Sequence, residues 1–85
     1  MSRNYNVVLN IEALEALPRS GKRRELVLSF IKDLAWSSHI GGDVSFQDEL
    51  SLRPYEMNVV AGYAITWWID APVNEIRVVD IRPSS

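Results

Sequence analysis

The sequence lacks cysteine, has a single histidine, and contains no apolar run near the roughly 20 residues that a helix needs to cross a bilayer. Without cysteine, disulfides and thiolate metal sites are excluded, and the cytoplasm is the expected compartment. The opening MSRNYNVVLN has no apolar segment typical of a signal peptide, which agrees with that compartment and with no membrane contact. Nine basic residues against eleven acidic ones also argue against a broad phosphate-binding surface.

Motifs for the common chemistries are missing as well. The sequence has no P-loop, no GxGxxG, no HExxH and no nucleophile elbow. His39 lies among serines and glycines, where a solvated side chain is a better interpretation than a catalytic base, and it has no neighbours with which to build a metal site. We therefore expect no cofactor and no metal, while the question of enzymatic activity stays open.

What the sequence does contain is enough apolar material for one small domain over residues 1–85, with 47% hydrophobic residues and three tryptophans. The last third is the centre of the expected fold. Runs of β-branched and aromatic residues at Tyr63–Ile69 and Glu75–Ile81 flank a connection containing Pro72, which predicts a β-hairpin. Both runs are too apolar for a sheet edge, so we expect both strands in the middle of the sheet.

The first half predicts a strand and two helices. Alternation indicates a strand over Tyr5–Ile11, and Asn10 is expected to cap a short helix over Ile11–Leu17. After Pro18 and Gly21 a longer helix is expected over Lys22–Ser37. The predicted buried stripes consist of Ala13, Leu14 and Leu17 in the first helix and of Leu26, Val27, Phe30, Ile31, Leu34 and Ala35 in the second.

The remaining segments complete the expected order. Ser37–Pro54 is either an extended loop or an irregular edge segment, and Tyr55–Ala61 alternates as a strand that ends in a tight turn at Gly62. The polar tail Pro83–Ser85 is expected to fray. The sequence thus predicts an α+β domain of order β-α-α-β-β-β, in which a helical hairpin packs on a mainly antiparallel twisted sheet.

Two features are candidates for partner binding. Trp67 and Trp68 are adjacent and must face opposite sides of a strand, so one can be core while the other needs a second small core layer or a partner. The cations around Arg23 and Arg24 are either a solvated helix start or a contact for phosphate or an acidic partner, because cations are disfavoured at the positive end of a helix.

The layout and the segments GYAITWWID and NEIRVVDIRP resemble the RelE/ParE superfamily of bacterial toxins, as does the start of the first helix at Glu12-Ala13-Leu14. Members are toxin components of type II toxin–antitoxin modules, including plasmid stabilisation systems. The resemblance implies a cognate antitoxin as partner, with either messenger RNA on the ribosome or DNA gyrase as target. It assigns target contact to Arg77 and Arg82 and suggests Trp68 as an interface anchor.

The sequence also departs from the ribonuclease branch of that family. Glu56 and Asn58 stand where such members often carry arginine, and no tyrosine follows Arg82. The gyrase branch needs no catalytic constellation. A third interpretation is that the protein is an inert protein-interaction module that keeps the toxin fold. These alternatives stay open, as does a homo-oligomeric state.

Overall fold

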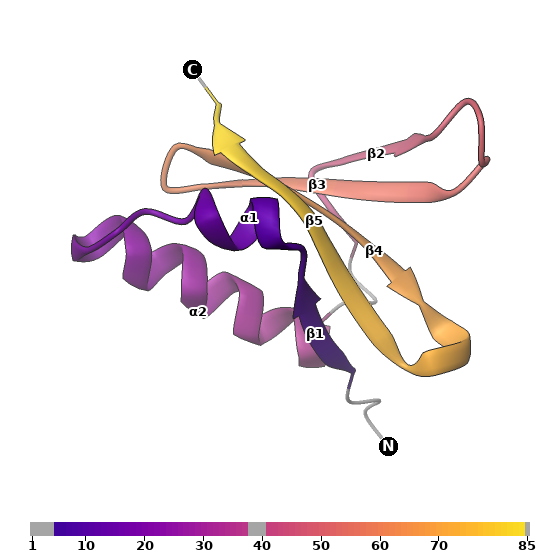
Figure 1. Cartoon of the computed structure of the whole chain (residues 1–85), viewed down its shortest axis with the longest axis horizontal. Coiled ribbons are helices and arrows are strands. Elements are labelled where there is room, and N and C mark those ends of the chain that lie inside the picture. Colours follow the sequence, from indigo (N-terminus) through magenta and orange to yellow (C-terminus); the bar gives the residue numbers. More distant parts are fainter. Residues whose placement is uncertain (1–4, 38–40, 85) are drawn as a thin grey trace.

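The computed structural model describes residues 5–37 and 41–84, which form two helices and a five-stranded sheet. The start of α2 and the connection between β2 and β3 lie at opposite ends of the longest axis (Figure 1). The elements in chain order are β1 (Asn6–Leu9), α1 (Ile11–Glu15), α2 (Gly21–Ser37), β2 (Val44–Gln47), β3 (Pro54–Val60), β4 (Tyr63–Asp70), the 3-10 turn η2 (Ala71–Val73) and β5 (Glu75–Pro83).

The sheet has the strand order β1-β5-β4-β3-β2, and it confirms the expected α+β class. β4 and β5 each have a neighbour on both sides, as their apolar sequences predicted. All neighbouring pairs are antiparallel except β1 and β5, which are parallel. The two helices connect β1 to the rest of the sheet and supply the long crossover that a parallel pair requires. Of the two interpretations of residues 37–54, the edge segment is correct for Val44–Gln47, while residues 38–40 lie outside the described part.

Two tight connections shape the meander from β3 to β5. Ala61 and Gly62 both have positive φ, of 54° and 83°, and they form the two-residue turn between β3 and β4. The connection from β4 to β5 uses η2 with Pro72 near its start, followed by Asn74 in the left-handed conformation. Both connections lie where the sequence placed turns.

A β-bulge in the central hairpin keeps the core residues of β5 on one face. Trp67 pairs with Val78 and Thr66 pairs with Asp80, so Val79 is the extra residue. Without it, strand alternation would send Ile81 to the opposite face from Val78. With it, Val78 and Ile81 are both buried, at 0% and 2% exposure, against the helices.

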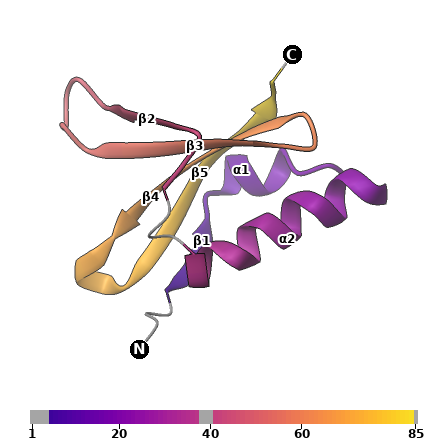
Figure 2. The same cartoon turned by 180° about the vertical axis from the view of Figure 1, so that it is seen from behind.

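The helices cover one face of the sheet, with α1 against β5 and α2 against β1 and β3 (Figures 1 and 2). Two members of the predicted stripes are not buried: Leu14 is 57% exposed and Leu26 is 44% exposed. α1 is only five residues long, and Ala13 is the residue that it buries. In α2 the buried positions recur every four and three residues at Val27, Ile31 and Leu34, and Leu28, not the predicted Leu26, packs against the core beside them.

Asn10 is the N-cap residue of α1, as predicted, but it caps the helix with its backbone and not with its side chain. Its backbone is extended, with φ −64° and ψ 156°, as is usual for an N-cap residue. Its carbonyl accepts a hydrogen bond from the Leu14 backbone N–H at 2.9 Å, while its side chain makes no capping hydrogen bond. The Asn10 backbone N–H donates to the Val78 carbonyl at 3.0 Å, which ties the start of α1 to β5. In a strand its side chain shares a face with Asn6 and Val8, on the side of the sheet away from the helices.

The expected fraying of the tail begins later than Pro83. Pro83 is the last residue of β5, and the Ser84 backbone N–H donates to the Gly62 carbonyl at 2.9 Å. This bond ties the end of β5 to the turn between β3 and β4. Ser85 lies outside the described residues.

Candidate functional site

The candidate site is the face of the sheet opposite the helices, which we call the helix-free face. The core side chains of β4 and β5 pack on α1 and α2 from the other side. Alternation then directs Tyr55, Met57, Thr66 and Trp68 to the helix-free face, where all four are only half-buried. Within residues 5–37 and 41–84, neither helix covers them.

One part of this face is a hollow of about 470 Å³, which we call the apolar hollow. The rings of Phe46 and Tyr55, which pair across β2 and β3, are stacked with their centroids 5.5 Å apart and their planes 19° apart. The bulge in β5 brings the successive residues Val79 and Asp80 to the same hollow. The full lining is Phe46, Asp48, Tyr55, Met57, Ala64, Thr66, Val79, Asp80 and Arg82.

The charged residues of the apolar hollow are already paired or hydrogen-bonded. Arg82 is exposed, and its Nε donates to Asp80 Oδ2 at 2.6 Å. This hydrogen bond, together with the charge of Asp80, raises the pKa of the Arg82 guanidinium. Asp48 accepts hydrogen bonds of 2.8 Å from the Ser51 backbone N–H and hydroxyl, and these lower the pKa of its carboxyl.

A second group, which we call the Trp68 cluster, consists of Arg53, Trp68 and Arg77. The guanidinium carbon of Arg53 lies 3.9 Å from the centroid of the Trp68 ring, and that of Arg77 lies 6.0 Å from it. The cluster borders a polar hollow of about 370 Å³, which Asn10, Asp70 and Val79 complete. Trp68 is therefore half-covered by an arginine of its own chain, neither packed in a second core layer nor bare.

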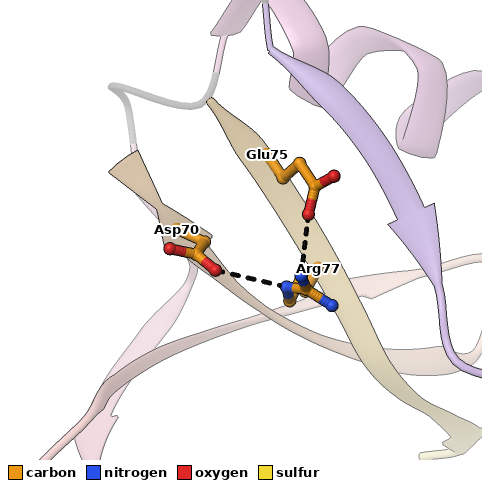
Figure 3. A network of polar contacts seen from close by, with 3 residues as sticks. All are labelled: Asp70, Glu75 and Arg77. Atoms are coloured by element: carbon orange, nitrogen blue, oxygen red, sulfur yellow. Dashed lines mark hydrogen bonds and ion pairs between the residues drawn. The ribbon is translucent and has the colours of Figure 1, made fainter. Parts of the chain in front are cut away.

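Figure 3 shows how Arg77 is held at the end of the central hairpin. Its Nε lies 3.4 Å from Asp70 Oδ2, and one of its terminal nitrogens lies 2.8 Å from Glu75 Oε1. Glu75 Oε1 is buried and has no hydrogen bond of good geometry to any described residue. The ion pair with Arg77 therefore offsets the cost of removing this oxygen from water. Arg77 is thus fixed by two carboxylates, one on each strand of the hairpin.

The structure brings some of the predicted residues together and separates others. Trp68 and Arg77 pair directly across β4 and β5. Arg82 lies on the same strand as Arg77 but borders the apolar hollow, so the two arginines do not form one site. Arg23 and Arg24 lie at the start of α2 in the helical layer, where Arg24 donates to the Pro18 carbonyl at 2.9 Å. His39 lies outside the described residues.

Sequence reasoning missed several members of this face. The alternation around Phe46 and Tyr55 was visible, but only the register of β2 with β3 shows that the two rings stack. Asn10 was expected only as a helix cap, and its place in the lining of the polar hollow was missed. Arg53 directly precedes β3, and nothing in its local sequence indicates that it folds back over Trp68.

Within the described ranges, no three histidine, cysteine or acidic side chains lie close enough together to hold a metal ion. In the same residues, no helix is long and apolar enough to span a membrane. A comparison with known protein families and with curated proteins found no match for this chain.

Proposed function

We propose that this chain is a RelE/ParE-like toxin component of a bacterial type II toxin–antitoxin module, which acts in the cytoplasm and contacts its target through the helix-free face. The resemblance of GYAITWWID and NEIRVVDIRP supports the proposal, since these segments form the central strands β4 and β5. The observation that carries it is the position of Arg82. This residue lies next to the end of the last strand, where the resemblance places a basic residue, and its side chain is 71% exposed beside the apolar hollow.

The target is either messenger RNA, whose cleavage stops translation, or DNA gyrase. Cleavage of RNA needs positive charge around the phosphate and a group that moves protons. Arg82 supplies a charge, but Asp80 partly neutralises it. Arg77 is likewise balanced by Asp70 and Glu75. This pairing of both arginines favours the alternative of an inert interaction module, which would use the same face to bind a protein without chemistry.

The test is induced expression in a bacterial host, with growth scored in the presence and absence of the neighbouring open reading frame. Growth arrest that the neighbour relieves is expected for a toxin with its antitoxin. Unimpaired growth at high soluble expression would contradict the toxin proposal and leave the interaction module.

The variant Arg82→Ala separates the branches. If the chain is a ribonuclease, this change is expected to abolish growth arrest while the thermal unfolding temperature stays unchanged, because Arg82 is exposed. The matched control is Arg19→Ala, which removes an exposed cation outside the helix-free face and should leave arrest intact. Arrest by Arg82→Ala at the wild-type level would rule out a ribonuclease that depends on this residue.

A further inference from the structure

The polar hollow beside the Trp68 cluster is lined by hydrogen-bond donors that the folded chain does not use. No described residue accepts a hydrogen bond from the Asn10 side-chain amide, the Trp68 indole N–H or the Arg53 guanidinium. Donors left over at a concave surface are satisfied by water or by a ligand rich in acceptors. The hollow therefore suits an oxyanion.

Arg53 and Arg77 contribute in different ways. Arg77 is anchored by Asp70 and Glu75. Arg53 forms no salt bridge with any residue of the described ranges, although Asp48 is near enough for the charge of Arg53 to help lower its pKa. The guanidinium carbon of Arg53 lies over the Trp68 ring at 3.9 Å, and a cation held by a ring face keeps its N–H groups for a ligand.

The charge around the hollow distinguishes between oxyanions. Two arginines and the two carboxylates of Asp70 and Glu75 give no net charge. Because these carboxylates balance Arg77, Arg53 is the one cation of the Trp68 cluster left for a ligand, whereas a nucleic-acid strand is held through several phosphate contacts. A single carboxylate places one negative charge next to Arg53, and the planar fork of an arginine matches its geometry. A peptide carboxylate fits these conditions better than a nucleic-acid backbone.

We infer that the Trp68 cluster is a binding site for an aspartate or glutamate side chain in an acidic segment of the partner protein. The inference rests on the proposed function only in taking the partner to be a protein. Arg53 forms the charge-assisted hydrogen bonds, and Asn10 and the Trp68 indole N–H supply further donors. The Trp68 ring holds the Arg53 guanidinium beside the polar hollow.

The experiment is a nuclear magnetic resonance titration of the purified chain with end-blocked hexaglutamate, which follows the arginine Nε–Hε and tryptophan indole signals. We expect saturable shifts of the Arg53 and Trp68 signals. The Trp67 indole is an internal reference, because it is buried and already donates to Asn58. Hexaglutamine should cause no shift, and added salt should weaken the binding of hexaglutamate.

Two charge-matched variants decide whether the site is specific. Arg53→Gln is expected to weaken hexaglutamate binding about tenfold or more, because it removes the charge-assisted pair. Arg19→Gln removes the same charge from an exposed position outside the helix-free face and should bind like the wild type. Equal weakening by both variants would overturn the inference in favour of general charge attraction. Tighter binding of hexauridylate than of hexaglutamate at the same signals would overturn it in favour of nucleic acid.

The outcome is separable from that of the proposed function. Growth tests need the cellular target, whereas the titration needs only the folded chain. Saturable binding of hexaglutamate without growth arrest would remove the toxin proposal and keep the carboxylate site. Growth arrest without binding of hexaglutamate would support the toxin proposal and overturn the carboxylate site.

Discussion

The indole N–H of Trp67 donates a 2.8 Å hydrogen bond to Oδ1 of Asn58, on the neighbouring strand β3. Trp67 is fully buried and is the largest of the fully buried side chains. Its one polar atom is therefore satisfied inside the core by an asparagine that a sequence pattern would assign to a surface. Because of this hydrogen bond, a tryptophan can be buried in the centre of the sheet without an unpaired indole N–H.

Replacing Asn58 should destabilise the fold. Asn58→Ala leaves the Trp67 indole N–H buried without its partner, and we expect the free energy of unfolding to fall by about 1–3 kcal/mol. Chemical denaturation followed by tryptophan fluorescence measures this difference. The matched control is Asn6→Ala on the exposed side of β1, for which we expect a change within about 0.5 kcal/mol. Equal losses in both variants would show that the hydrogen bond to Trp67 is not the cause.

The turn between β3 and β4 predicts that two substitutions change the free energy of unfolding in opposite directions. Gly62 has φ 83°, so Gly62→Ala should lower the free energy of unfolding by about 1–2 kcal/mol. Ala61 has φ 54°, an uncommon conformation for a residue with a Cβ, so Ala61→Gly should raise the free energy of unfolding by about 1 kcal/mol. Thermal unfolding of the two variants beside the wild type checks both signs. A stabilised Gly62→Ala variant would contradict the assigned turn.

The hydrogen bonds from Ser51 to Asp48 predict a dependence on pH. They lower the pKa of the Asp48 carboxyl in the folded chain, so its contribution to stability is present above the ordinary aspartate pKa. It is lost as the pH falls through the lowered value. Asp48→Asn should therefore be less stable than the wild type near neutral pH, with the difference vanishing in strong acid. Denaturation at a series of pH values measures it, and Glu49→Gln at the next residue serves as the control. A difference that persists unchanged into strong acid would contradict this origin.

The ion pair between Asp80 and Arg82 predicts a gain of activity if Arg82 contacts an anionic target. Asp80→Asn leaves the side-chain shape almost unchanged but removes the charge that neutralises Arg82. We expect stronger growth arrest for this variant than for the wild type at equal expression. Glu75→Gln removes a carboxylate that pairs with Arg77 and does not line the apolar hollow, and it serves as the comparison. Weaker arrest by Asp80→Asn would indicate that the pair holds Arg82 in its working position.

Much of the fold could be predicted because it depends on local rules. Alternating apolar residues predicted β1, β3, β4 and β5 close to their observed bounds, and the turn at Gly62 followed from the residue type. The helices followed as well, although α1 ends at Glu15 and not at Leu17, and Leu14 and Leu26 are exposed members of the predicted buried stripes. Which side of a helix is buried depends on how much sheet lies beneath it, and that is not a local property.

The candidate site was less predictable because its parts come from distant segments. Trp68 and Arg77 could be singled out, but Arg53 reaches the Trp68 ring from the connection before β3. Asn10 reaches the same hollow from the end of β1. The identity of a residue indicates which interactions its side chain can make. The register of the sheet decides which other side chains are close enough to make them.

The sequence by itself determined the class of the fold, the central position of β4 and β5, and the absence of cysteine chemistry, since these follow from alternation, apolar content and composition. Only the tertiary structure decided that Val79 forms a bulge, that Arg53 covers Trp68, and that Arg77 and Arg82 belong to separate hollows. The physical reason is that alternation fixes the face of each side chain within a strand, while strand pairing and loop closure fix its neighbours.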